Sequence, residues 1–326
     1  MEFSAPPPPV SAAGYMPDEA DSFAEGFWSV LEAAMETLSP ALHDSLQSCL
    51  RVLCAVLLTA LAGQLSGKKV GAELAGIAAV SALLLEPSAE LMSSGLETVR
   101  ELRSYGNLLL PVMASALAAC GGVTASSALY AGTAVFDSIL SGAASKVFEP
   151  MLGAFVAMSI ASGTAAEPLL GKIRDLIRFC MEWSLKLLLY LFTGYMTVTG
   201  IFSGTADAAA GKAAKIALSG AVPVVGGILS DAADAVVLSA SMLGNGAGIW
   251  GIFTVLAIFF APAIRIGMRY LLLKLTAAIG SALGAGRTAQ LIEDFATAMG
   301  LLLALVSTQA VLLLISVVCF LKGTVS

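Results

Sequence analysis

The residue types in this sequence that could carry chemistry are isolated carboxylates inside apolar stretches. Asp231 and Asp234 are three residues apart, so a helix would place both on one face. Two such carboxylates can bind a cation or line a polar path through a membrane. The alternative is that they cap, or face water at, the end of a short span. The four candidate path or ion contacts are Asp137, Asp207, Asp231 and Asp234.

Glycine and proline residues near these carboxylates predict close helix packing and a hinge. The Gly200-xxx-Gly204 spacing is typical of membrane helices that approach each other closely. Pro223 and two following glycines interrupt the next apolar run. We therefore predict helix-packing or hinge roles for Gly194, Gly200, Gly204, Pro223, Gly226 and Gly227.

Most other chemistry is excluded by the inventory of side chains. The chain has one histidine, His43, and five cysteines without a CxxC pair, so a usual metal site or a Ser–His relay is not expected. Gly211-Lys212 and the 286–288 sequence Gly-Arg-Thr both depart from the phosphate-loop pattern. We expect no enzyme, no cofactor and no metal. If the protein drives an energy-requiring process, the energy must then come from a partner or an ion gradient.

The composition predicts an all-α, polytopic integral membrane protein. The 326 residues are 58% hydrophobic and 12% charged, whereas a soluble domain is about half apolar and a quarter charged. The first 50 residues hold eight acids and no Lys or Arg, so the net charge of −6 belongs to this segment. A soluble enzyme, a disordered chain and a nucleic-acid-binding protein are therefore poor interpretations.

Charge and hydropathy divide the chain into four predicted segments. Residues 1–48 form an acidic, extracytoplasmic, amphipathic segment, without the basic and apolar regions of a signal peptide. Residues 49–105 form a hairpin of two spans, 50–66 and 70–85, followed by an interfacial helix over 86–105. Lys68 and Lys69 place the turn of this hairpin in the cytoplasm. The other two segments are 106–216 and 217–326.

These last two segments resemble each other and predict two similar halves. Pro111-Val112 and Pro223-Val224 are 112 residues apart, as are Pro150 and Pro262, each two residues after a Phe. Each half ends in a strong span, over 183–204 and 299–321, that follows basic residues, which favours a parallel repeat. The apolar stretches from Pro111 and Pro223 are too short to cross a bilayer, so broken or re-entrant helices are expected there.

One long motif resembles a known family. The sequences TGYMTVTGIFSGTAD and SGAVPVVGGILSDAADAV, with a Lys-bearing helix between them, resemble the stage III sporulation protein AE family of endospore-forming bacteria, most specifically over residues 193–238. The similarity covers about residues 50–326. The family usually begins with a signal sequence, from which this chain departs. The family supplies no catalytic residues to transfer.

The resemblance implies a multi-pass protein of the mother-cell membrane around the forespore. There it implies partnership with the other stage III sporulation AA–AH proteins and with stage II sporulation protein Q in a transenvelope channel, or feeding tube. The lipid bilayer and a second copy of the chain are further expected partners. We expect a permease-like membrane subunit that supports passage of small molecules or export. An ion-coupled secondary transporter and a non-conducting scaffold are the alternatives.

Overall fold

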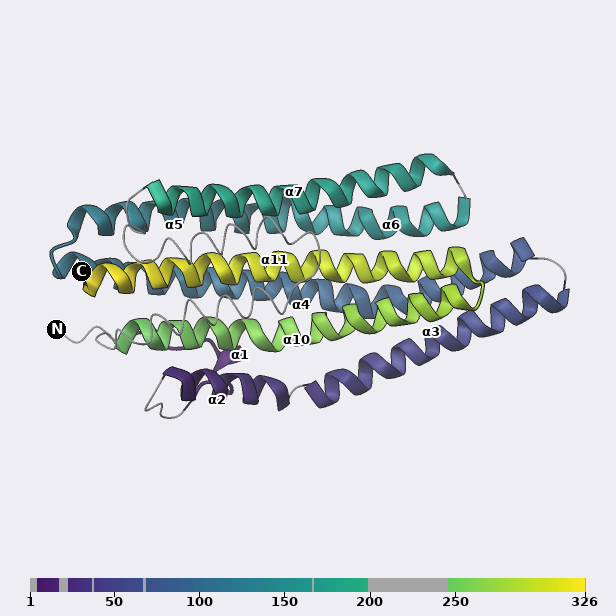
Figure 1. Ribbon diagram of the computed structural model, residues 1–326, viewed down its shortest axis with the longest axis horizontal. Coiled ribbons are helices and arrows are strands. Elements are labelled where there is room, and N and C mark those ends of the chain that lie inside the picture. The colour runs from purple at the N-terminus through teal and green to yellow at the C-terminus, as the bar shows by residue number, and fades with distance from the viewer. Residues whose placement is uncertain are drawn as a thin grey trace.

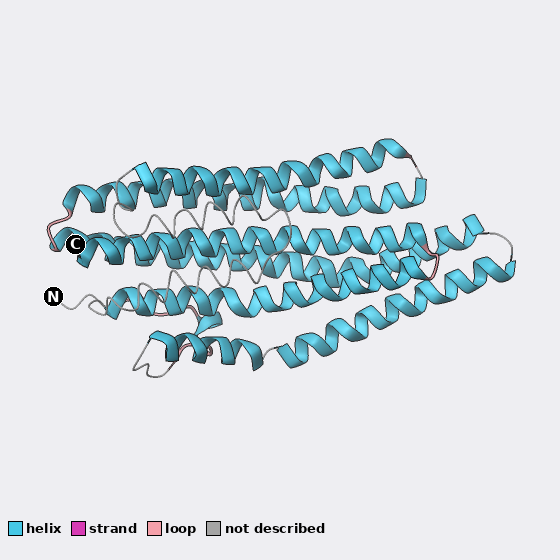
Figure 2. Ribbon diagram, in the orientation of Figure 1, coloured by secondary structure: helices cyan, strands magenta, loops and turns pink. Residues whose placement is uncertain are grey.

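The computed structural model describes residues 5–17, 23–36, 38–66, 69–165, 167–198 and 246–325. Throughout these ranges the regular secondary structure is helical, without a strand (Figure 2). The helices are α1 Val10–Ala13, α2 Phe23–Glu36, α3 Leu38–Ser66, α4 Lys69–Ala119, α5 Val123–Ala143, the π-helical turn η1 Ala144–Phe148, α6 Glu149–Ala165, α7 Pro168–Val198, α10 Gly246–Ala282 and α11 Gly286–Val325.

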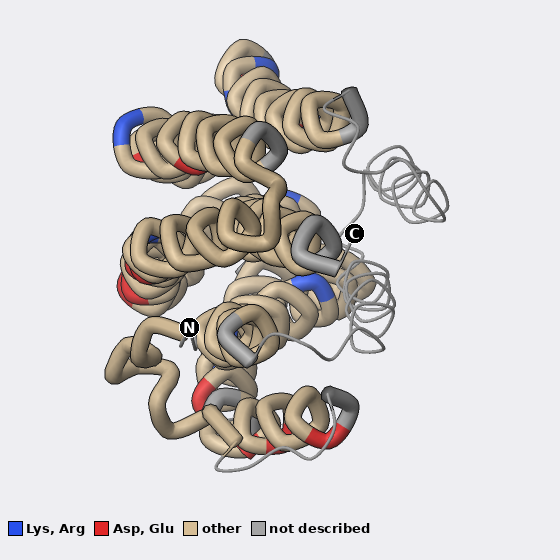
Figure 3. The backbone as a smooth tube through the Cα atoms, turned by 90° about the vertical axis from the view of Figure 1, so that its left-hand side faces the viewer, with Lys and Arg blue, Asp and Glu red and all other residues tan. Residues whose placement is uncertain are grey.

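The long helices form an antiparallel bundle in which α11 is central. Figure 1 shows α7 and α6 along one side of the bundle and α3 along the other, with α11, α4 and α10 between them. Helix α11 contacts α10, α4, α5, α6 and α7. The end-on view in Figure 3 shows that charged positions are sparse along these helices. An apolar helix surrounded by neighbours in this way forms the core of the bundle.

The described helices confirm an all-α polytopic membrane protein. Five segments are long and apolar enough to cross a bilayer: Leu42–Leu65, Val70–Ala119, Ser126–Ala165, Gly248–Ala282 and Gly286–Leu321. A crossing needs about 20 apolar residues, so each of the five exceeds the minimum. The spans in α10 and α11 are largely buried by their neighbours, whereas less than a third of the apolar part of each of the other three is buried. The bundle therefore presents α3 to α6 to its surroundings.

Helix α4 differs from the expectation of separate short elements. It is a single helix of 51 residues with Pro87 and Pro111 inside it. The predicted interfacial helix over 86–105 is therefore part of α4, and the prediction of a short helix that begins at Pro111 is wrong. A proline removes one backbone hydrogen bond, but residues on both sides of Pro111, such as Leu109 and Met113, are buried in the bundle. The chain instead turns at Gly121, whose φ of +95° favours glycine.

Two of the predicted segment boundaries fall inside helices. The 48/49 boundary lies within α3 and the 105/106 boundary lies within α4. Pro262, which marks the second half, also lies inside a helix, α10. The stretch from Pro223 lies outside the described residues, so the division into four segments and two similar halves stays a prediction.

Glycines in α4 let α11 approach closely. A Cβ atom added to Gly95 would lie 2.8 to 2.9 Å from Cγ and both Cδ atoms of Leu302. One added to Gly106 would lie 3.1 Å from Cδ1 of Leu313. The two glycines are 11 residues apart, which is close to three helical turns, so they share one face of α4. The α4–α11 interface thus uses the small-residue packing that is typical of membrane helices.

Candidate functional site

Buried polar groups on α11 are the feature from which a functional site can be built. Asp294, Gln309 and Ser316 are buried although they lie in the apolar span Gly286–Leu321. Each bonds to a side chain of α5 or α7. Polar residues inside membrane spans normally face the bundle interior, where they pair or line a path. Two clusters, one around Asp294 and one around Asp137, result.

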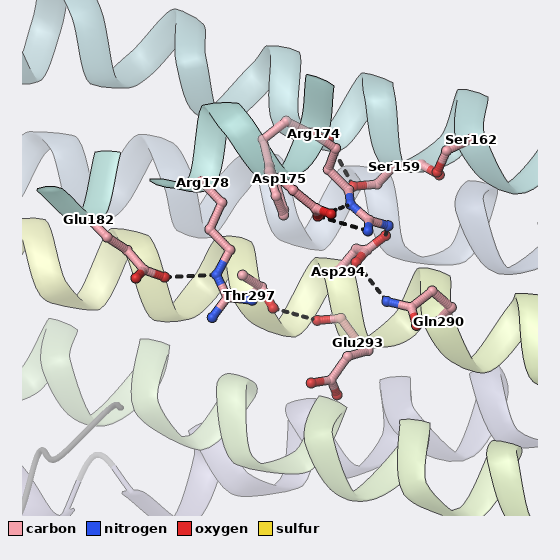
Figure 4. Close-up of polar contacts among 11 residues, drawn as sticks. Ser159, Ser162, Arg174, Asp175, Arg178, Glu182, Gln290, Glu293, Asp294 and Thr297 are labelled. Carbon is pink, nitrogen blue, oxygen red and sulfur yellow. Dashed lines mark hydrogen bonds and ion pairs between the residues drawn. The ribbon is translucent and has the colours of Figure 1, made fainter. Parts of the chain in front are cut away.

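The Asp294 cluster joins α7 to α11 (Figure 4). Nη1 of Arg174 donates to Oδ2 of Asp294 at 2.7 Å, and Nε2 of Gln290 donates to Oδ1 at 3.2 Å. The same guanidinium donates from Nε and Nη2 to Oδ1 of Asp175, at 3.1 and 2.9 Å. Ser159 of α6 lies beside the pair. Three helices therefore meet at one ion pair.

Burial and charge act in opposite directions on Arg174. Its side chain is 15% exposed, and burial by itself lowers the pKa of a guanidinium. The negative charges of Asp294 and Asp175 outweigh this effect, so the pKa of Arg174 lies above its ordinary value. The guanidinium of Arg174 therefore stays charged beside the two carboxylates.

More exposed ion pairs surround this centre. Nε of Arg178 donates to Oε1 of Glu182 at 2.7 Å within α7. Lys274 of α10 pairs with Glu293 of α11 and lies 5.8 Å from the ring centroid of Tyr270. Solvated pairs of this kind contribute little to stability. The buried Arg174–Asp294 pair is therefore the one that matters for the geometry.

The Asp137 cluster joins α5 to α4 and α11. Asp137 is 3% exposed, accepts a hydrogen bond from Nε2 of Gln309, and has Nε of Arg103 at 3.7 Å from its Oδ2. Nη1 of Arg103 donates instead to Oγ of Ser141 at 2.9 Å. One turn away, Oγ1 of Thr133 donates to Oγ of Ser316 at 3.1 Å. The bundle interior thus holds a carboxylate, an amide and three hydroxyl groups.

The oxygen atoms of the Asp137 cluster could hold a cation or hydrogen-bond a polar solute. In the described ranges, no group of three or more His, Cys, Asp and Glu side chains is arranged to hold a metal ion. A nucleophile with an adjacent base is likewise not seen in either cluster as described.

Comparison with known proteins supplies the family. Residues 27–323 match the family described as stage III sporulation protein AE. This chain belongs to that family. No solved structure matches it.

A curated relative carries the same description. The stage III sporulation protein AE of Bacillus subtilis (strain 168) is 27% identical to this chain over 191 residues. The matched region is 58% of this chain and 48% of the relative, so the chain spans about half the length of the curated relative that it matches. Membership supports a role in sporulation.

The structure brings together one of the four predicted carboxylates with partners that the sequence did not identify. Asp137 contacts Arg103, which the sequence predicts in an interfacial helix, and Gln309, whose neutral side chain does not stand out in the sequence. The other three, Asp207, Asp231 and Asp234, lie outside the described residues.

The predicted hinge and packing positions are mostly not described. Gly194 is exposed at the end of α7, and among the described residues a Cβ added there would meet nothing within 4 Å. Its packing role stays a prediction. Five other positions lie outside the described residues: Gly200, Gly204, Pro223, Gly226 and Gly227.

Proposed function

We propose that the chain is a membrane subunit of the transenvelope channel that links mother cell and forespore during sporulation. It would lie in the mother-cell membrane around the forespore and act with the other stage III sporulation AA–AH proteins and stage II sporulation protein Q. It would have no enzymatic activity of its own. The proposal is based on family membership together with one observation: two buried clusters of ionisable residues in the bundle interior, one of which is built from three candidate membrane spans.

The buried clusters support a permease-like role because charge in a membrane span is costly. A charge at the bilayer centre costs about 2.5–3.5 kcal/mol by insertion measurements, so it persists mainly where a path or a partner needs it. Asp137, Arg103 and Gln309 come from three different candidate spans. A helix bundle held together only by packing needs none of these groups.

A non-conducting scaffold is the competing function, and one observation favours it. Asp137 and Asp294 both have cationic partners, and a paired charge can serve only to fix which helices associate. The two functions differ in whether water reaches the Asp137 cluster. A channel subunit needs such access, whereas a scaffold does not.

Accessibility of a cysteine at Ser141 tests the proposal in sporulating cells. We would start from a functional variant in which only native Cys120 remains, replace Ser141 or its neighbour Leu140, which are both buried, with cysteine, and apply a small, charged methanethiosulfonate reagent. Modification at Ser141 but not at Leu140 is expected, because Ser141 faces Arg103. Exposed Cys120, at the α4–α5 turn, is the positive control.

The same experiment separates the two functions. Protection of both new cysteines, with Cys120 modified, would show a dry cluster and overturn the channel proposal in favour of the scaffold. A loss of spore formation on modification of the Ser141 cysteine would strengthen the channel proposal. The chain is already folded and assembled when the reagent is added, so failed assembly would not explain the loss.

A further inference from the structure

The Asp137 cluster holds its cation loosely. The 3.7 Å separation between Nε of Arg103 and Oδ2 of Asp137 is longer than a hydrogen bond, and Nη1 of the guanidinium donates to Ser141 instead. At Asp294 the corresponding contact is 2.7 Å, and Gln290 adds a further donor. The two buried carboxylates are therefore held in different ways: Asp294 is hydrogen-bonded to its cation, whereas Asp137 only faces one.

Gln309 leaves an acceptor without a donor beside Asp137. Its Nε2 donates to Asp137, but its Oε1 is buried and accepts no hydrogen bond from a described residue. Gln309 is 0% exposed, so bulk water does not satisfy this oxygen. A buried acceptor without a partner is unfavourable, and each one requires an explanation. A carboxylate and an amide oxygen in one place are hard oxygen ligands.

Arg103 can leave the cluster, whereas Asp137 cannot. The side chain of Arg103 is 39% exposed and that of Asp137 is 4% exposed. A long arginine side chain moves its charged head readily toward water, as it does at membrane interfaces. Withdrawal of the guanidinium would free a volume larger than a monatomic ion. The same does not hold for Arg174, whose side chain is only 15% exposed.

We propose that Asp137, Oε1 of Gln309 and Oγ of Ser141 bind an alkali-metal ion, sodium or potassium, in exchange with the guanidinium of Arg103. A bare proton would neutralise Asp137 but leave Oε1 of Gln309 without a partner, whereas a metal ion is shared among several oxygens. The role of this site in the cell rests on the proposed membrane function, because exchange of the ion for the guanidinium would couple ion binding to a conformational change. Binding itself can be measured apart from that role.

Thermal unfolding of the purified full-length chain in detergent tests the exchange. The melting temperature is followed by tryptophan fluorescence in sodium, potassium or choline chloride at one ionic strength. We expect it to rise with the alkali-metal ion and not with choline, because a ligand of the folded state stabilises it. Arg103→Gln is expected to lower the half-saturating concentration about tenfold, since it removes the competing cation. Asp137→Asn is expected to abolish the effect.

Matched variants keep the test decisive. Arg178→Gln removes an exposed guanidinium of α7 and should leave the half-saturating concentration unchanged. Ser141→Ala removes one ligand but no charge, so it should raise that concentration even if Asp137→Asn fails to fold. The width of the sodium-23 resonance on addition of the protein gives a second, direct reading of binding.

Three outcomes would overturn the inference. These are equal stabilisation by choline and the alkali-metal ions, an Arg103→Gln variant that only melts earlier without a change in half-saturation, and a dependence on pH alone. If the ion binds as expected but the Asp137→Asn chain still supports sporulation, the binding site stands and the proposed channel function falls.

Discussion

Arg174→Met is expected to destabilise the bundle by about 3–5 kcal/mol, because removal of one partner of a buried ion pair leaves the other charge uncompensated. Asp294 has a side chain that is 7% exposed and lies in an apolar span. Gln290 would remain as its hydrogen-bond donor but carries no charge. The measurement is unfolding of the purified chain in mixed detergent micelles, followed by tryptophan fluorescence.

An exposed arginine on the same helix provides the control. Arg178 pairs with Glu182, and its side chain is 49% exposed. Arg178→Met should therefore cost at most about 1 kcal/mol. The double variant Arg174→Met, Asp294→Leu should recover most of the lost stability, since apolar side chains of similar volume often replace a buried pair without penalty. Equal losses in both single variants would show that Asp294 is hydrated, contrary to the structure.

The membrane class is predictable from sequence because hydropathy is additive over residues. The five helical segments that could cross a bilayer are identified by their length and composition, whatever their neighbours are. Helix boundaries are less predictable because tertiary packing outweighs a local breaker. Pro111 would end an isolated helix, yet α4 continues to Ala119 against α11. The chain next turns at Gly121, where the turn depends on a glycine with positive φ and not on a proline.

The candidate site was predictable only in part. Asp137 was identified because it is a lone acid in an apolar run, and ionisable residues are rare inside membrane spans. Its partner on α11 is 172 residues away and neutral, so periodicity carries no information about the pairing. Arg174 and Asp294 are 120 residues apart, and each stands among other charged residues. They are buried because α6, α7 and α11 become neighbours, and the local sequence pattern does not determine which helices do so.

Small-residue packing was expected as a mechanism, but the glycines described as packed are others. The Gly200-xxx-Gly204 pattern draws attention because it is compact. Gly95 and Gly106 are spaced by 11 residues, a period that also returns to one helix face. Gly142 and Gly153 have the same spacing, yet a Cβ added at either would meet no atom of the described residues within 4 Å, so this spacing alone does not identify the α4 face that receives α11.

Gly95→Leu is expected to have the second large effect, a loss of about 3 kcal/mol or more, because overpacking of a tight interface forces helices apart. The added side chain would start 2.8 to 2.9 Å from the branched end of Leu302, which is fully buried. Gly153→Leu is the matched control: a Cβ at Gly153 meets nothing within 4 Å, and the residue is exposed on α6. It should unfold like the unaltered chain.

A double variant that moves the large side chain from α11 to α4 makes the prediction specific to this contact. Leu302→Ala alone should cost about 2–5 kcal/mol through the cavity that it leaves. In the double variant Gly95→Leu, Leu302→Ala the new leucine can occupy that cavity, so the two losses should fall short of additivity by about 0.5–3 kcal/mol. Strictly additive losses would mean that the two positions do not touch. In that case α11 would not be seated on the glycine face of α4, and the position of Gln309 opposite Asp137 would have to be reassigned.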